Sequence, residues 1–178
     1  MGSQGKKKGL IIVNTGHGKG KTSSALGVTL RALGYDFKVS IIQFTKGSWK
    51  TGEERIAKKL GPNYEIISMG LGFTWLSKDI KKDEQKAKEA WRLGHEKIMS
   101  GAYQIVVLDE ITYAINYGFI SIKDVLHTLN NKPTLLHVII TGRDAPKELI
   151  EIADLVTEMT LVKHPYQKGV MAQRGIEF

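Results

Sequence analysis

The stretch TGHGKGKT, residues 15–22, constrains this chain more than any other feature of its sequence. The run before it, residues 10–14, is short and rich in β-branched residues, which predicts a strand. The segment after it, residues 21–33, carries apolar residues at helical spacing and ends just before a glycine. A glycine-rich loop between a strand and a helix is typical of a phosphate-binding loop. The usual pattern G-x-x-x-x-G-K-[ST] begins with glycine, whereas Thr15 stands there in this chain.

The residue types of this loop match the chemistry of phosphate. Alternating glycines allow successive backbone N–H groups to turn toward an anion, and the positive end of the following helix dipole adds to the attraction. A lysine at the helix start can reach phosphate oxygens, and the next hydroxyl can bind Mg²⁺. A simple glycine-rich turn is the alternative, and the Lys-Thr pair that follows the glycines disfavours it. The expected nucleotide-binding residues here are Thr15, Gly16, His17, Gly18, Lys19, Gly20, Lys21, Thr22 and Ser23.

The segment VVLDE, residues 106–110, is an apolar run that ends in two carboxylates. Asp109 and Glu110 are therefore candidates to hold a metal, directly or through water, together with Thr22. Arg143, in the motif TGR after a further apolar run, is a candidate phosphate contact, and a surface arginine is an equal alternative. Arg31 lies about three turns along the first expected helix, and the same two interpretations apply to it.

Strand-like and helix-like segments alternate along the chain, which predicts a mostly parallel sheet with helices on both faces. The expected class is α/β, P-loop NTPase-like (RecA-like), with residues 1–8 as a flexible basic N-terminus and 9–178 as one domain. Asp144 is expected to cap a helix with Pro146 in its first turn. Further strands are expected at residues 38–44, 64–69, 104–108, 137–140 and 154–160, and further helices at 52–60, 79–100 and 121–129.

Composition narrows the function classes. The 178 residues include no cysteine, which excludes a disulfide framework, a thiolate zinc site and a cysteine nucleophile. No apolar segment approaches membrane-spanning length. The net charge of +8 favours an anionic partner, but no basic stripe with interleaved aromatics supports nucleic acid. Only five residues are arginine, which weakly disfavours a small-molecule kinase with an Arg-rich lid.

The segment MGLGFTW, residues 69–75, is unusual for a plain NTPase. It follows an expected strand, so it lies at the edge of the sheet where ligands bind in such folds. Its glycines imply a loop that can move, and Phe73 and Trp75 are two large aromatics within it. They are either plugs of the core or contacts to a ligand, and the sequence pattern leaves both open.

Several segments together resemble the P-loop type of corrinoid (ATP:cob(I)alamin) adenosyltransferase. These are TGHGKGKTSSALG, VSIIQFTKGSW, GFTW, VVLDEITYAINYG, VIITGRDAP and the tail VKHPYQKGVMAQRGIEF, in order from residue 9 to residue 178. Thr15 belongs to this family's form of the loop. Relatives carry a longer N-terminal arm, so shielding of the site by such an arm is not carried over.

The resemblance implies that ATP gives its 5′-deoxyadenosyl group to Co(I) of a reduced corrinoid, forming adenosylcobalamin and releasing triphosphate. ATP would lie reversed along the loop, with Mg²⁺ or Mn²⁺. Phe73, Thr74 and Trp75 would bind the corrinoid, and Phe73 and Trp75 would displace the lower ligand of cobalt. Catalytic roles would fall on these two aromatics and Glu110.

The expected partners are cobalamin or another corrinoid and an acidic electron donor such as a flavoprotein, with a homodimer in the cytoplasm and no nucleic acid or membrane. One alternative is a P-loop kinase or NTPase, which would release ADP or diphosphate instead of triphosphate. Another is a nucleotide-switched module that binds nucleic acid, which would show salt-dependent binding to DNA.

Overall fold

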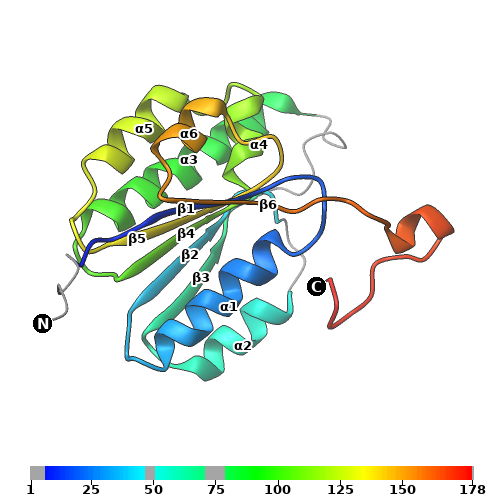
Figure 1. Cartoon of the computed structure of the whole chain (residues 1–178), viewed down its shortest axis with the longest axis horizontal. Coiled ribbons are helices and arrows are strands. Elements are labelled where there is room, and N and C mark those ends of the chain that lie inside the picture. Colours follow the sequence, from blue (N-terminus) through cyan, green and yellow to red (C-terminus); the bar gives the residue numbers. More distant parts are fainter. Residues whose placement is uncertain (1–6, 47–50, 71–78, 178) are drawn as a thin grey trace, which may run out of the picture.

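The computed structural model describes residues 7–46, 51–70 and 79–177 (Figure 1). Its six strands form one parallel sheet in the order β3-β2-β4-β5-β1-β6. Because all strands run the same way, their carboxyl ends share one edge, on the right of Figure 1. The strands are β1 (Ile11–Thr15), β2 (Val39–Gln43), β3 (Tyr64–Ser68), β4 (Ile105–Asp109), β5 (His137–Thr141) and β6 (Leu155–Glu158).

Helices cover both faces of this sheet (Figure 1). Two of them, α1 (Lys21–Leu33) and α2 (Gly52–Leu60), lie on one face. The other face carries α3 (Ile80–Met99), α4 (Ile111–Asn116), α5 (Ile122–Asn130) and α6 (Lys147–Ile152). A short 3₁₀ helix, η2 (Pro165–Lys168), lies in the C-terminal tail beyond the sheet. The expected α/β architecture with a parallel sheet between two helical layers is confirmed.

The position of β4 inside the sheet, with helices on both faces, explains why its residues before Asp109 are all apolar. Val106 and Leu108 pack into the core with α3–α6, whereas Ile105 and Val107 pack into the core with α1 and α2. All four are at most 3% exposed. Alternate side chains of a strand point to opposite faces, so a strand covered on both sides has no polar face. Its first polar residue, Asp109, therefore marks the edge where the strand ends.

Local sequence signals account for where three of the six described α-helices begin. The side chains of Thr51, Asp79 and Ser121 accept hydrogen bonds from backbone N–H groups in the first turns of α2, α3 and α5. Each provides an acceptor for an N–H group that has no partner within the helix. The start of α1 is different, because its N-cap is Gly20 with φ 108° and no capping side chain. That end of the helix leaves its N–H groups for the phosphate loop and its ligand.

One local expectation was wrong, and one element was missed. Asp144 does not cap α6, since Pro146 holds the N-cap position and Asp144 has φ 50° in the preceding loop. The helix α4 was not foreseen, since its six residues follow the carboxylates of β4 without a capping side chain.

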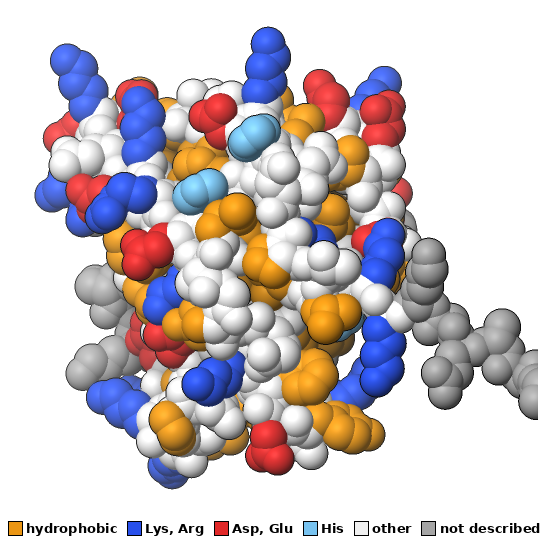
Figure 2. Space-filling view, turned by 90° about the vertical axis from the view of Figure 1, so that its left-hand side faces the viewer, with side chains coloured by type: hydrophobic (Ala, Val, Ile, Leu, Met, Phe, Trp, Pro, Cys, Tyr) orange, Lys and Arg blue, Asp and Glu red, His pale blue; other side chains and the backbone are white. Residues whose placement is uncertain are grey.

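Charge is mixed on the face opposite the ligand edge. Figure 2 shows this face, where Lys and Arg side chains alternate with acidic and apolar ones around the rim. The net charge of +8 is therefore not gathered into one basic surface there. Within residues 7–46, 51–70 and 79–177, no helix is both long and apolar enough to cross a membrane.

Candidate functional site

The phosphate loop leaves β1 at Thr15 and enters α1 at Lys21. Gly16 and Gly20 have φ values of 95° and 108°, a region in which a side chain is strained, so glycine is required at both. The hydroxyl of Thr15 accepts a 3.1 Å hydrogen bond from the N–H of Ala145. Thr15 thus ties the start of the loop to the segment after β5, which gives the residue at the non-glycine position a structural role.

Lys21 turns its ammonium group back into the loop. Its Nζ donates to the carbonyl oxygens of Gly16, at 2.8 Å, and Gly18, at 2.7 Å. Burial lowers the pKa of Lys21, and the nearby carboxylate of Glu110 opposes that shift. An ammonium has three N–H donors, so one remains for an anion in the loop. The side chain is only 7% exposed, which makes it a fixed positive charge at this position.

The N–H group of Gly18 bonds to the chain after β6 and is not available to an anion in the loop. Its N–H donates a 2.6 Å hydrogen bond to the carbonyl oxygen of Met159, just after β6. A side chain here would lie 2.7 Å from the carbonyl oxygens of Met159 and Thr160. The expectation that successive N–H groups of the loop all turn toward an anion therefore fails at Gly18, because the chain after β6 occupies that side of the loop.

Asp109 is the buried centre of the site. Its Oδ1 accepts hydrogen bonds from the hydroxyls of Thr22, at 2.8 Å, and Thr141, at 2.7 Å. Its Oδ2 accepts from the amide of Gln43 at 3.1 Å. The residue is 1% exposed, and these three donors compensate its charge. Asp109 therefore joins the ends of β2, β4 and β5 to the first turn of α1.

Glu110 differs from its neighbour in having an unsatisfied oxygen. Its Oε2 is buried and makes no hydrogen bond with any described residue. Its backbone has φ 64°, and its N–H donates to Thr141 Oγ1 at 2.9 Å. Burial, and then the charge of Asp109, raise the pKa of Glu110 to about 7, against the opposing charges of Lys21 and Arg143. A carboxyl group in this state is suited to receive a cation.

The oxygen donors at this edge are suited to bind Mg²⁺. Among the described residues, no group of three or more His, Cys, Asp or Glu side chains could hold a metal by itself. Thr22, Asp109 and Glu110 instead provide one hydroxyl and two carboxylates. Mg²⁺ is usually held by one or two carboxylates, with substrate phosphates and water completing its shell. The donor set therefore suits a metal that arrives with a nucleotide.

The segment after β5 brings further groups to this edge. Gly142 has φ 142°, and a side chain on it would lie 2.0 Å from the hydroxyl of Thr112. That hydroxyl donates to the carbonyl oxygen of Arg143 at 2.6 Å, which fixes the backbone there. His17 Nε2 lies 3.1 Å from Asp144 Oδ1, both side chains being exposed. Arg143 is exposed, and its charge acts on Lys21 and Glu110, whereas His17 lies within the phosphate loop itself.

Other predicted residues lie elsewhere. Arg31 is exposed in the last turn of α1, about 15 Å along the helix from Lys21, so the structure does not bring it to the loop. Ser23 is exposed in the first turn of α1. Lys19 forms a 2.5 Å ion pair with Glu177 in the tail. Phe73, Thr74 and Trp75 lie outside the described residues.

Two residues of this cluster were missed in the sequence, namely Gln43 and Thr141. Both are fully buried polar residues at the ends of strands that flank β4. The sequence signal was available, since each polar side chain terminates an otherwise apolar run beside the predicted carboxylates. Pairing those runs as neighbours of β4 required the strand order, which the sequence does not specify.

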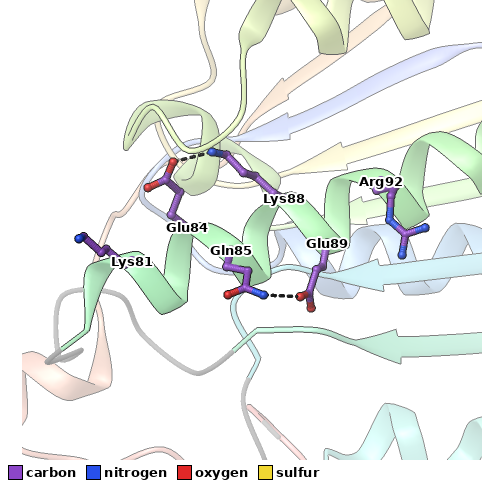
Figure 3. A pocket seen from close by; sticks show the side chains of 6 residues that line it. All are labelled: Lys81, Glu84, Gln85, Lys88, Glu89 and Arg92. Atoms are coloured by element: carbon purple, nitrogen blue, oxygen red, sulfur yellow. Dashed lines mark hydrogen bonds and ion pairs between the residues drawn. The ribbon is translucent and has the colours of Figure 1, made fainter.

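A surface depression on α3 lies apart from this cluster. Its lining comes from one helix: Lys81, Glu84, Gln85, Lys88, Glu89 and Arg92 (Figure 3). Glu84 pairs with Lys88 at 2.6 Å, and Gln85 donates to Glu89 at 3.1 Å. Four of the six side chains therefore pair along the helix, and the lining residues do not converge on a common point as the groups around Asp109 do.

Comparison with known proteins relates this chain to one family. The model of the family ATP:corrinoid adenosyltransferase BtuR/CobO/CobP matches residues 7–178. A corrinoid adenosyltransferase of Sinorhizobium sp. is 43% identical over 180 residues, covering 100% of this chain and 84% of that protein. Those of Pseudomonas aeruginosa and Escherichia coli K12 are 41% and 38% identical over 172 residues, each covering 97% of this chain and 85% and 87% of theirs.

Among solved structures, domain III of the Thermotoga maritima replication initiation protein DnaA matches with a TM-score of 0.39 and 17% identity, covering 88% of this chain and 56% of that one. The fold assignment follows from the strand order and the loop, not from that likeness. Neither a kinase nor a nucleic-acid-binding module is favoured by the matched family and the named relatives.

Proposed function

The chain belongs to the ATP:corrinoid adenosyltransferase family, and we propose how its residues divide the work of that reaction. The enzyme transfers the 5′-deoxyadenosyl group of ATP to the cobalt of a reduced corrinoid. Co(I) supplies an electron pair to C5′, the cobalt–carbon bond forms, and the C5′–O bond breaks. The electron pair of that bond leaves with triphosphate. The phosphate loop therefore binds a leaving group, and phosphate itself is not transferred.

The phosphate loop stabilises the charge that grows on the departing triphosphate. Lys21 is buried and fixed by two carbonyl oxygens of the loop, so its positive charge is in place before ATP binds. A preorganised charge costs no rearrangement when the bond breaks, which makes it more effective than a mobile one. Gly16, Gly20 and the first turn of α1 add backbone N–H groups, and Arg143 and His17 lie beside them.

The proposal includes Mg²⁺, or Mn²⁺ in its place. Thr22 and Glu110 would bind it directly, and Asp109 would act through the Thr22 hydroxyl that it holds at 2.8 Å. The unsatisfied Oε2 of Glu110 is the observation that carries this assignment. When bound, the metal neutralises triphosphate charge. Arg31, far from the loop along α1, would contact the nucleotide only if ATP extends along that helix.

The corrinoid would bind where the chain leaves β3. Met69 N–H donates to the carbonyl oxygen of Gln43 at 3.0 Å, so this exit lies at the same sheet edge as the phosphate loop. Phe73, Thr74 and Trp75 follow a few residues later. We assign Phe73 and Trp75 the displacement of the lower cobalt ligand, because losing that donor makes Co(II) easier to reduce to Co(I).

The proposed partners include an acidic electron donor, such as a flavoprotein, and a second copy of the chain, in the cytoplasm. A net charge of +8 supports attraction to an acidic protein. The edge strand β6 exposes Leu155 and Val156, at 50% and 37%, and the tail after it exposes more apolar side chains. Apolar groups along an edge strand support self-association there.

One experiment tests the reaction directly. Protein, ATP, Mg²⁺ and chemically reduced cobalamin are mixed without oxygen, and the absorption spectrum is followed together with the phosphate products. We expect the adenosylcobalamin spectrum to appear and triphosphate to accumulate in equal amount. Release of ADP or diphosphate, with no change in the cobalamin spectrum, would instead establish a phosphoryl-transfer enzyme or NTPase.

A further inference from the structure

Gln43 is a buried polar side chain that bonds to both neighbouring strands. It ends β2, which lies between β3 and β4 in the sheet, and it is 0% exposed. Its Nε2 donates to Asp109 Oδ2 at 3.1 Å, and its Oε1 accepts from Ser68 Oγ at 2.9 Å. One amide group thus connects the carboxylate at the end of β4 with the hydroxyl at the end of β3.

The chemistry of the partners dictates an amide at this position. An ionised carboxylate only accepts hydrogen bonds, so the NH₂ group of Gln43 must face Asp109. The amide oxygen then necessarily faces Ser68, which can donate to it. A methionine of similar length would satisfy neither partner, and a glutamate would place a second negative charge against Asp109. The position therefore asks for a group that donates on one side and accepts on the other.

At the nucleotide side, this connection continues into the phosphate loop. Asp109 accepts from Thr22 in α1 and from Thr141, whose hydroxyl oxygen in turn accepts the N–H of Glu110. A nucleotide-bound metal would be coordinated by Thr22 and Glu110. Thr22 bonds to Asp109, and Glu110 bonds through its N–H to Thr141, so both belong to the cluster around Asp109. Gln43 is in direct contact with Asp109, the carboxylate at the centre of this cluster.

At the other side, the connection reaches the segment that leaves β3. The hydroxyl of Ser68, at the end of β3, has a single proton, which it shares between Gln43 Oε1 and a carboxylate oxygen of Glu54 in α2. The next residue, Met69, donates its N–H to the backbone oxygen of Gln43 itself at 3.0 Å. A side chain on Gly70 would lie 2.5 Å from the backbone oxygen of Phe44. The end of β2 thus sets the direction in which the chain departs from β3.

We propose that Gln43 is a positioning residue that couples the nucleotide side of the site to the corrinoid side, through Asp109 on one strand and Ser68 on the other. This inference rests on the proposed function, since the segment beyond Gly70 carries the residues assigned to the corrinoid. The coupling makes each substrate bind more tightly when the other is present, and linkage requires the two factors to be equal. Couplings of this kind in proteins are typically about 5- to 150-fold.

Binding of hydroxocobalamin, with and without Mg·ATP, measures this coupling in the intact protein. Its cobalt is Co(III), which is not a nucleophile, so ATP remains uncleaved and both Kd values are equilibrium constants. Titration calorimetry is carried out on the parent protein and on the variants Gln43→Met and Ser68→Ala. Thr128→Val is the matched control, because Thr128 is a buried hydroxyl, 3% exposed, that bonds to His95 and Asp124 on the far side of the sheet.

We expect Mg·ATP to lower the Kd of hydroxocobalamin at least about fivefold in the parent protein and in Thr128→Val. The ratio should fall close to one in Gln43→Met and in Ser68→Ala, with smaller changes in the Kd values of the single ligands. The proposal is overturned if the ratio of the two hydroxocobalamin Kd values stays parent-like in both Gln43→Met and Ser68→Ala. It is also overturned if that ratio is one in the parent protein, or if Thr128→Val lowers it as much as the site variants do. If Gln43→Met does not fold, Ser68→Ala decides the outcome.

This result is independent of the reaction test. A parent protein that forms adenosylcobalamin while Gln43→Met keeps full coupling contradicts only the role of Gln43. A parent protein that forms none contradicts the proposed function, whatever the binding ratios are.

Discussion

The hydroxyl of Thr22 donates a 2.8 Å hydrogen bond to Oδ1 of Asp109, which joins the first turn of α1 to the end of β4. A hydroxyl has one proton and two lone pairs, so this bond leaves the lone pairs of Thr22 available to a metal. Asp109 therefore orients Thr22 and is itself nearly enclosed by Thr141 and Gln43. Glu110, whose Oε2 has no partner among the described residues, is therefore the carboxylate that we propose for the open metal position.

The first prediction concerns the phosphate loop. Lys21→Ala removes a buried charge, and Thr22→Ala removes the hydroxyl held by Asp109. Each variant should lower kcat on the order of 10²- to 10³-fold, as loss of one preorganised group commonly does, because both groups act on the departing triphosphate. The measurement is triphosphate release at saturating ATP and Mg²⁺. Ser24→Ala, an exposed change on the same helix, is the control and should keep parent activity. Normal turnover in both loop variants would contradict the assignment.

The second prediction follows from the pKa of Glu110, which burial raises from 4.5 to about 7. Between these values the folded protein holds a proton that the unfolded chain has lost. The free energy of unfolding of the nucleotide-free protein should therefore fall as pH rises through this range, by at most about 3 kcal/mol. Denaturant titrations at pH 5 and pH 8 measure this fall. Glu110→Gln carries no titrating carboxyl, so the difference between the two pH values should shrink in that variant.

The third prediction concerns the same carboxyl when the ligand arrives. If Glu110 binds Mg²⁺ as a carboxylate, then Mg·ATP must displace its proton below about pH 7. Titration calorimetry at pH 6, in two buffers with different ionisation enthalpies, should show proton release that exceeds that of Glu110→Gln by up to one proton. At pH 8 the two proteins should match. Equal release at pH 6 would place Glu110 outside the metal site and leave Asp109 as the remaining carboxylate.

The sequence was sufficient for the order of the strands and helices along the chain, apart from α4, and for the position of the phosphate loop. The strand β4 and the loop glycines Gly16 and Gly20 depend on short-range sequence patterns. A few neighbouring residues were therefore enough to predict them. The hydrogen bonds of Gln43 and Thr141 depend on which strands are neighbours, and strand order is a property of the whole chain. The contact of Gly18 with Met159 likewise joins residues far apart in sequence. These features therefore became visible only in the structure.

The fourth prediction compares two glycines for stability. Gly142 has φ 142°, and a side chain there would lie 2.0 Å from Thr112 Oγ1, so Gly142→Ala must displace a residue that anchors the loop after β5. We expect it to lower the free energy of unfolding by more than 1 kcal/mol. Gly27 lies within α1 with open space around it, and Gly27→Ala should raise the same quantity by about 0.5–1 kcal/mol. Denaturant midpoints measure both, and destabilisation by Gly27→Ala would contradict the open environment found there.

The last prediction separates the two roles that the sequence left open for Phe73 and Trp75. If these aromatics displace the lower ligand of cobalt, they act while Co(II) is being made reducible, and they matter little once Co(I) exists. Phe73→Ala and Trp75→Ala should then lose most activity when the assay starts from Co(II) with a protein reductant. With pre-formed Co(I), both variants should retain much more of the parent rate.

A structural role for these two aromatics gives a different pattern. Deleting a buried aromatic costs about 3–5 kcal/mol of stability, because contacts with the surrounding core are lost together with the transfer free energy. The parent rate would then fall equally in both assays, and the melting temperature would fall with it. That pair of results would contradict the proposal that Phe73 and Trp75 displace the lower cobalt ligand. A loss confined to the Co(II) assay, at an unchanged melting temperature, would place both side chains against the lower face of the corrinoid.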